Sequence, residues 1–304
     1  MGHHHHHHHH HSHHHHHEHG NEKNLKVAFF INFAFTIIEL IGGFYTNSMA
    51  IMSDAIHDLG DSLSLGLSWS FERISKKKRS STFSFGYKRF SLLAALINAN
   101  ILVIGSIIII IESLKRFTVP AEIKTTEMLI MAILGVVFNG IAFLRLEKGT
   151  GINVNVIRLH LLEDILGWVA VLIVAVIFQF HYIPFLDPLV SVLIAGYIIF
   201  NAIKNLKATL KIFLQAVPEE HNIDEIEQLI KNENQISSVH DLHIWSLSEN
   251  YVILTAHIVL KEKMDSDKVA IIKNQIKEVL KRKGIEHATL EFETSDEHCH
   301  LQDC

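Results

Sequence analysis

Long apolar stretches separated by short polar segments dominate the first two thirds of the chain. Each holds about the 20 residues that an α-helix needs to cross the hydrocarbon core of a bilayer. The pattern predicts an α-helical membrane protein with six transmembrane helices, at residues 25–45, 49–74, 90–114, 128–144, 154–180 and 186–203. Pro120 and Pro184 mark the loops before the fourth and sixth of these helices.

From Pro218 onwards the pattern becomes that of a small soluble α+β domain. Residues 221–231 and 266–283 have the periodicity of helices, whereas residues 236–247, 251–260 and 288–293 have that of strands. The predicted order of elements is αββαβ. About ninety residues are just enough to form a core of their own.

The first twenty residues are nearly all histidine and have no apolar pattern. Such a segment cannot bury enough apolar surface to fold alone. Two origins fit it, an expression tag and a native tail that buffers metal ions. We therefore divide the chain into a His-rich disordered tail (residues 1–20), a six-helix transmembrane domain (21–212) and a C-terminal domain (213–304).

The distribution of charged residues predicts the orientation of the chain in the membrane rather than a nucleic-acid partner. The formal net charge of the 304 residues is only −5, so a nucleic-acid partner is not expected. Lys and Arg gather in the loops after the second and fourth predicted helices, and the loops after the first and fifth contain none. The loop after the third helix is an exception, with three basic residues. Since basic loops stay inside, we predict a multi-pass protein of the cell membrane with both termini in the cytoplasm.

The second predicted helix carries four ionisable side chains within its apolar run. Asp54, His57, Asp58 and Asp61 follow the i, i+3, i+4, i+7 spacing that places side chains on one face of a helix. Charges in a bilayer are costly and usually functional. Because this helix has no Lys or Arg in its apolar part, the carboxylates need a metal ion or protons to balance them.

The fifth predicted helix repeats part of this pattern, because His160 and Asp164 have the spacing of His57 and Asp61. Two such helices facing each other would bring together two imidazoles and two carboxylates. This donor set suits a tetrahedral divalent ion such as Zn²⁺. The repeat favours these four residues as ligands, although spacing alone does not exclude Asp54 and Asp58.

Other polar positions in or near the spans are interpreted as helix packing, with Glu163 exposed or in an outer shell. The packing positions are Glu39, Asn98, Asn100, Glu112 and Asn139. Asp187 precedes a proline at the start of the sixth helix, so we interpret it as a helix cap.

The C-terminal third offers two further candidate metal sites. His240 and His257 on predicted strands could approach Glu293 on the last strand. Cys299 and Cys304 lie among histidines in the terminal tail, and thiolates with imidazoles suit zinc or copper. As these are the chain's only cysteines, no disulfide framework is expected.

Taken together, these features resemble the cation diffusion facilitator family, and most closely its zinc-transporting CzcD-like branch. The resemblance rests on the six spans, the paired His-x-x-x-Asp motifs, the His-rich start and the His240-Asp241-Leu242-His243-Ile244-Trp245 run. It implies a homodimer that exports Zn²⁺ in exchange for protons. It also implies a cytoplasmic C-terminal domain with a metallochaperone-like fold that binds metal and mediates dimerisation.

The resemblance also assigns residues. It matches His57, Asp61, His160 and Asp164 to the transport site, and His240, His257 and Glu293 to cytoplasmic metal-binding positions. Some members bind metal between the second and third helices, but residues 72–89 contain neither His nor Asp, so that site is not expected. Manganese and iron branches tend to have aspartate at the first motif position. His57 therefore points to zinc, with cadmium and cobalt as secondary cargoes.

Two rival functions remain open on the sequence alone. An intramembrane metalloprotease would need a general base beside an open zinc position, usually as His-Glu-x-x-His, and no such motif occurs. A zinc-sensing membrane protein would bind metal without moving it. The expected partners are divalent metal ions, protons, the lipid bilayer and a second copy of the chain, and no enzymatic activity is expected.

Overall fold

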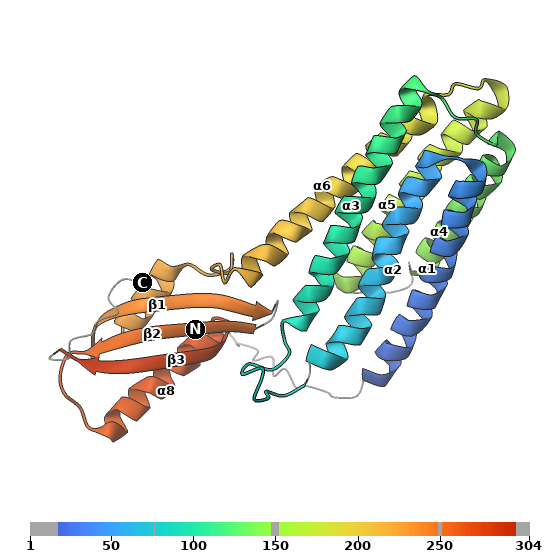
Figure 1. Cartoon of the computed structure of the whole chain (residues 1–304). Helices are drawn as coiled ribbons and strands as arrows, with labels where there is room; N and C mark the ends of the chain where they lie inside the picture. The colour runs from blue at the N-terminus through green and yellow to red at the C-terminus, as the bar shows by residue number, and fades with distance from the viewer. Residues whose placement is uncertain (1–17, 76, 147–151, 249–250, 296–304) are drawn as a thin grey trace, which may run out of the picture. The chain divides into compact units, whose positions relative to one another are not determined.

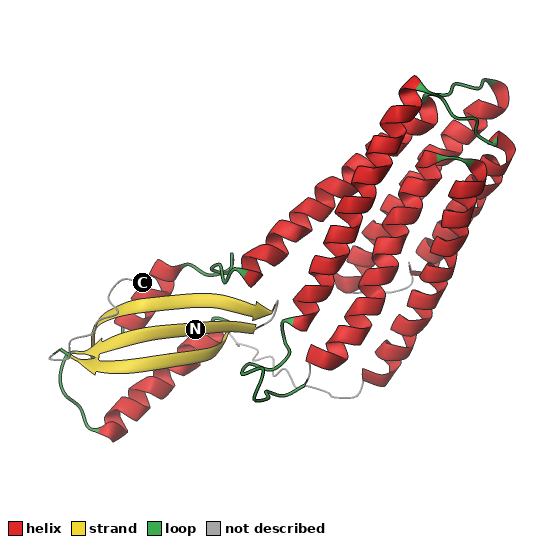
Figure 2. Cartoon of the chain, in the orientation of Figure 1, coloured by secondary structure: helices red, strands yellow, loops and turns green. Residues whose placement is uncertain are grey.

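The structure, a computed structural model, describes residues 18–75, 77–146, 152–248 and 251–295 (Figure 1). Its elements are long helices followed by a small domain with a sheet, as the colours of Figure 2 separate them. In chain order they are α1 (Glu18–Thr46), α2 (Met49–Ser75), α3 (Phe90–Thr118), α4 (Thr125–Leu146), α5 (Ile152–Phe180), α6 (Leu186–Phe213), α7 (Ile223–Lys231), β1 (Ile236–Ser248), β2 (Tyr251–Leu260), α8 (Ser266–Arg282) and β3 (Ile285–Thr294).

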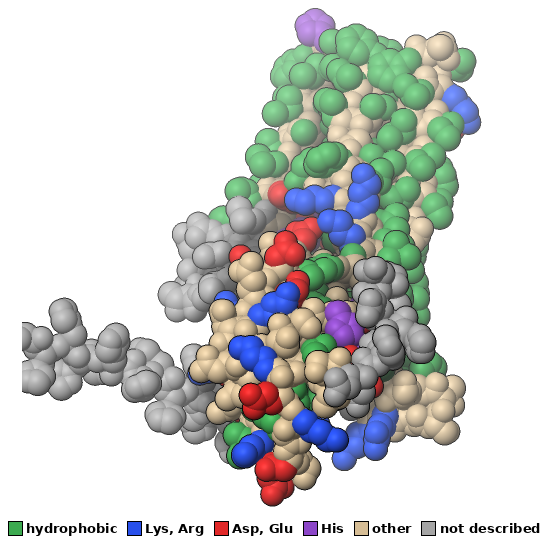
Figure 3. All heavy atoms as spheres, turned by 90° about the vertical axis from the view of Figure 1, so that its left-hand side faces the viewer, with side chains coloured by type: hydrophobic (Ala, Val, Ile, Leu, Met, Phe, Trp, Pro, Cys, Tyr) green, Lys and Arg blue, Asp and Glu red, His purple; other side chains and the backbone are tan. Residues whose placement is uncertain are grey.

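The long helices have the length and composition of membrane spans. Within the described ranges, five helices are apolar enough to cross a bilayer, namely α1, α3, α4, α5 and α6. The helix α2 is long enough but carries its stripe of acidic residues, so the sixth span remains a prediction. On the side seen in Figure 3, hydrophobic side chains cover much of the surface of the long helices. Phe44 and Phe180 are 81% and 79% exposed, as lipid-facing residues are.

The described residues divide into two compact units, one within 1–70 and 108–195 and the other within 71–107 and 196–304. The first unit has a buried core in which Trp168 of α5 has no exposed surface. Gly135 of α4 lies directly against the Trp168 ring, so a larger residue there would clash. Phe35 of α1 stacks on Phe138 of α4, with ring centroids 3.9 Å apart. This core packs α1, α4 and α5 together with the first turn of α2.

The start of α2 is held by α6 through Asp187, which is fully buried. Its Oδ1 accepts from the Ser48 hydroxyl at 2.5 Å and from the Ala50 N–H at 3.3 Å, and its Oδ2 accepts from the Met49 N–H at 2.8 Å. The Ser48 hydroxyl in turn accepts from the Ile51 N–H. The sequence analysis interpreted Asp187 as a cap of the sixth helix, and this assignment was wrong about which helix it caps. The residue caps α2, where a negative charge meets the positive end of the helix dipole.

Asp187→Ala should lower the free energy of unfolding by about 3 kcal/mol, because it strands buried N–H donors that a carboxylate satisfied. Thermal or chemical denaturation in detergent micelles measures the loss. Asp187→Asn keeps one acceptor oxygen and should lose less. Wild-type stability in both variants would show that the anchor contributes nothing.

The second unit contains a three-stranded sheet with the order β1-β2-β3. The strands β1 and β2 are antiparallel, with His240 opposite His257, whereas β2 and β3 are parallel, with His257 opposite Glu291. The register of β1 shifts between His240 and His243. A bulge of this kind changes which face a side chain points to.

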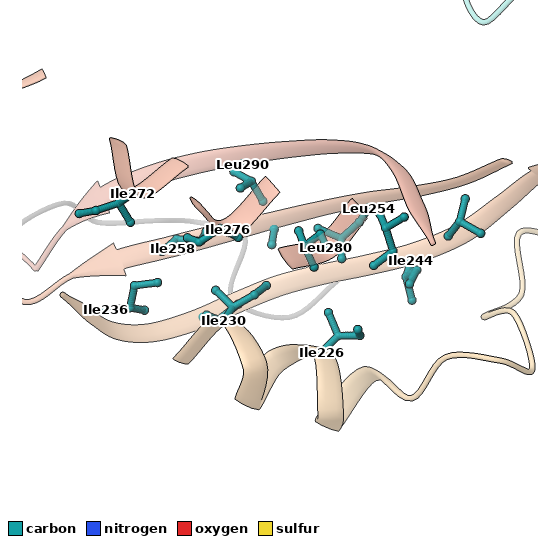
Figure 4. Packing of buried hydrophobic residues seen from close by; sticks show 14 residues of the cluster. Ile226, Ile230, Ile236, Ile244, Leu254, Ile258, Ile272, Ile276, Leu280 and Leu290 are labelled. Atoms are coloured by element: carbon teal, nitrogen blue, oxygen red, sulfur yellow. The ribbon is translucent and has the colours of Figure 1, made fainter. Parts of the chain in front are cut away.

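Helices α7 and α8 cover one face of this sheet. Ile226 and Ile230 of α7 and Ile276 of α8 join a single buried cluster with sheet residues such as Leu254 and Ile258 (Figure 4). Since side chains alternate along a strand, His257 points away from the core that Leu254 and Ile258 share. His257 and its β1 partner His240 therefore lie on the face of the sheet opposite the packed helices.

Candidate metal centre

Two helices position the first group of possible ligands. His57 and Asp61 lie on α2, and His160 and Asp164 lie on α5, each pair four residues apart. A spacing of four residues is just over one helical turn, so both members of a pair point the same way. The structure brings all four side chains together, with one donor atom from each lying within 4.8 Å of the others.

The shortest distances in this group join side chains of different helices. The His160 Nε2 atom of α5 lies 2.9 Å from Asp61 Oδ2 of α2, and His57 Nε2 of α2 lies 3.6 Å from Asp164 Oδ1 of α5. The distances within each helix are 3.8 Å for His57 to Asp61 and 4.0 Å for His160 to Asp164. The group is therefore formed by both helices and not by either alone.

These distances fit a small tetrahedral cation. Donor atoms about 2.1 Å from zinc at tetrahedral angles are about 3.4 Å apart, a value within the observed range. Asp164 Oδ1 and His57 Nδ1 are buried atoms without a hydrogen-bond partner among the described residues. A metal ion would give the Asp164 oxygen a partner, while the opposite nitrogen of His57 coordinates.

A gradient of exposure runs through the group. The Asp164 side chain is only 7% exposed, whereas that of His160 is 39% exposed. The carboxylate with the least access to water has the greatest need of a cation to balance its charge.

The structure also brings His240, His257 and Glu293 together on the open face of the sheet. His257 Nδ1 lies 2.5 Å from Glu293 Oε1, and His240 Nε2 lies 3.4 Å from Glu293 Oε2. The two imidazole rings are 5.3 Å apart. His240 Nε2 is buried without a hydrogen-bond partner in the described part of the chain, as a nitrogen reserved for a metal would be.

The sequence reasoning missed Asp241 beside this group. Asp241 Oδ2 lies 3.7 Å from His257 Nε2, and its Oδ1 lies 2.9 Å from His243 Nε2. Its backbone has a φ of 47°, the left-handed conformation that aspartate tolerates better than most residues. The bulge turns Asp241 toward His257, and only the local His-Asp-Leu-His run hinted at it.

Glu39, interpreted from the sequence as a helix-packing position, belongs to a third group. It lies on α1 and meets Asp54 and Asp58 of α2, with one carboxylate oxygen of each within 4.8 Å of the others. All three residues are buried. No sequence pattern pairs α1 with this face of α2. Cys299, Cys304 and the His-rich residues 1–17 lie outside the described residues.

Two family models match nearly the whole chain. The model for the cation efflux transmembrane domain matches residues 25–214, and the model for the cytoplasmic domain of cation efflux proteins matches residues 218–295. The boundary between the two matches lies near Pro218, where the composition of the chain changes.

Curated relatives align over most of their own length. The chain is 35% identical to the cadmium, cobalt and zinc/H(+)-K(+) antiporter of Bacillus subtilis, over 91% of this chain and 90% of the relative. It is 34% identical to the metal cation efflux system protein CzcD of Cupriavidus metallidurans, over 90% and 87%. It is 30% identical to the zinc transporter ZitB of Escherichia coli, over 94% and 91%. The chain therefore belongs to the cation diffusion facilitator family, whose members are membrane transporters of divalent cations and not enzymes.

Proposed function

We propose that this protein exports Zn²⁺ from the cytoplasm through the centre formed by His57, Asp61, His160 and Asp164. The observation that carries the proposal is the convergence of their four donor atoms within 4.8 Å, from two helices. Two imidazoles and two carboxylates are borderline donors that match zinc. The names of the relatives, which include zinc, cadmium and cobalt, support these ions as cargo.

The charge of the donor set suits transport through a membrane. Two neutral imidazoles and two carboxylates carry a charge of −2, so the zinc-loaded centre is neutral. A neutral cluster avoids most of the cost of placing an ion in hydrocarbon. His57 and Asp61 on α2 and His160 and Asp164 on α5 would hold the ion while access changes from one side of the membrane to the other.

Protons are the proposed counter-ions. Metal ligands must be deprotonated to bind, so zinc and protons compete for the lone pairs of the same four side chains. Protons that enter from outside would take the place of zinc as it leaves. The relative from Bacillus subtilis is named as an antiporter of protons and potassium ions, in keeping with such an exchange.

The proposed orientation places both termini in the cytoplasm, because the basic loops after α2 and α4 face inward by the positive-inside rule. Helix α2 would then start at the outer side. Zinc would enter from the cytoplasm and leave toward the outside. The sixth span that this topology requires is α2 itself, with its charges neutralised by cargo.

The cytoplasmic domain is proposed to bind metal through His240, His257 and Glu293 and to hold two chains together, with a metallochaperone-like fold. The support is its small sheet, which the described helices cover on one face only. A second copy would shield the other side. Cross-linking in native membranes tests the dimer, and a chain that transports as a monomer at every concentration would contradict it.

Flux into sealed vesicles tests the proposed function. Zinc added outside should reach a zinc-sensitive dye inside vesicles that contain the protein, and not inside protein-free vesicles of the same lipids. Membership of a transporter family excludes the metalloprotease alternative. Zinc binding without flux would instead favour the zinc sensor.

A further inference from the structure

Three buried carboxylates stand apart from the centre just described. Glu39 is 0% exposed, and Asp54 and Asp58 are 3% and 4% exposed. Asp54 and Asp58 are four residues apart on α2, and Glu39 reaches them from α1. The group, called here the carboxylate triad, contains only oxygen donors.

The triad has no evident neutralising partner. Both carboxylate oxygens of Glu39 and the Oδ2 atom of Asp54 have no hydrogen-bond partner in the described part of the chain. The sequence contains no Lys or Arg from Val27 to Glu72. A buried ionised carboxylate without a partner is very costly, so the triad must be neutralised, either by protons or by a bound cation.

Nearby donors of α1 are engaged elsewhere. The Asn32 side-chain amide donates to the Ser62 hydroxyl at 2.9 Å and to the Asp58 backbone carbonyl at 3.4 Å. The Thr36 hydroxyl donates to the Asn32 carbonyl at 2.9 Å. These bonds hold α1 against α2 and do not reach the side-chain oxygens of Glu39 or the Oδ2 atom of Asp54.

Helix α5 approaches the triad closely at a glycine. Gly167 lies beside Asp54, and a Cβ atom at this glycine would be 3.1 Å from Asp54 Oδ1. A larger residue would therefore press on the carboxylate. The glycine keeps α5 from crowding the oxygen atoms of the triad.

We propose that the carboxylate triad is a second cation site, separate from the zinc centre, that takes a hard cation of the alkali or alkaline-earth class. Oxygen-only ligand sets favour such ions, whereas imidazole favours zinc. The role of this second site in transport rests on the proposed function. Binding of a cation to the triad does not depend on that function.

Proximity couples the two sites. Asp58 of the triad precedes Asp61 of the zinc centre by three residues, about 4.5 Å along the axis of α2. Two cations this close in a poorly hydrated region repel each other, so each weakens binding of the other. A hard cation in the triad would thus promote release of zinc.

Manganese binding to the full chain in nanodiscs tests the proposal, because Mn²⁺ prefers oxygen donors and is visible by electron paramagnetic resonance. A His160→Ala background removes an imidazole from the zinc centre. In this background Glu39→Gln should weaken an oxygen-only Mn²⁺ signal at least about ten-fold, the lower limit for losing even an outer partner of a metal site. The matched variant Glu112→Gln, in which an exposed glutamate of α3 is changed, should leave the signal unchanged.

Competition then identifies the class of ion. Displacement of Mn²⁺ by K⁺ would assign an alkali cation, and displacement by Mg²⁺ alone would assign an alkaline-earth cation. Binding in the His-rich tail is common to all variants and cancels in the comparison. Glu39→Asp, which keeps the charge, should restore much of the signal.

Equal Mn²⁺ binding by Glu39→Gln and Glu112→Gln would overturn the proposal and leave protons to neutralise the triad. If Glu39→Gln fails to fold, Asp58→Asn in the same background replaces it. Weakened Mn²⁺ binding then supports the proposal, and unchanged binding overturns it. No step of this test needs flux. Absence of zinc transport would therefore defeat the proposed function and leave the result on the triad standing.

Discussion

Asp164→Asn should nearly abolish zinc transport and weaken zinc binding at the α2–α5 centre by at least about 100-fold. Breaking a buried charge pair on one side costs about 3 to 5 kcal/mol, which corresponds to a factor of 100 or more. The amide keeps the shape of the side chain but removes one of the two charges that balance Zn²⁺. Isothermal titration in detergent and flux into vesicles measure the two effects.

Two further variants serve as controls for Asp164→Asn. Asp267→Asn changes an exposed aspartate of α8 and should leave zinc binding and flux unchanged. Asp58→Asn removes a carboxylate of the triad and should affect zinc affinity less than Asp164→Asn does. Equally severe loss of zinc binding in Asp58→Asn and Asp164→Asn would place Asp58 among the zinc ligands and refute the assignment from the repeated motif.

An outward proton gradient should drive zinc uphill into vesicles whose cytoplasmic domains face outward. With an acidic interior and the membrane potential clamped, each proton exchanged per zinc supports about a tenfold accumulation for each pH unit. The reason is the competition of protons with zinc for the same four ligands. A zinc-sensitive dye inside the vesicles measures the accumulation.

An ionophore that dissipates the proton gradient is the control. Uphill accumulation should stop, and slow downhill exchange should continue. A channel would never move zinc uphill, whatever the gradient. Zinc movement without any opposing change of pH would refute proton exchange and leave the tetrahedral centre intact.

The convergence of His57, Asp61, His160 and Asp164 could be predicted because periodicity is a local property. The four-residue spacing of His57 and Asp61 places both on one face of α2, and its repeat at His160 and Asp164 indicates a facing helix. The proximity of the two pairs then required only that these two faces meet. The membrane helices themselves were predictable because a bilayer demands long apolar segments.

The triad and the Asp241 contact were not predictable by the same route. Glu39 lies on α1, and nothing in its own helix tells which face of α2 it meets. Asp241 faces His257 because β1 is bulged, and a bulge shifts the alternation on which strand patterns depend. Both depend on the packing of elements against each other.

Some helices of the structure extend beyond the ends predicted from the apolar pattern. Helix α6 continues to Phe213, beyond the predicted end at residue 203, because a helix can extend out of the apolar region with polar residues such as Lys204 and Lys207. Helix α1 likewise begins at Glu18, before the apolar run at Leu25. The apolar pattern marks the part suited to lipid rather than the whole helix.

The Asp187 anchor limits how the transport helices can move. Sliding of α2 along its axis by one turn would break the contacts to Ser48, Met49 and Ala50 together. Tilting about the anchored end would keep them and still displace His57 and Asp61, which lie two to three turns further along the helix. A movement of α2 that keeps this anchor intact would therefore be a tilt about its first turn. Such a tilt would displace the α2 members of the four-residue group relative to its α5 members.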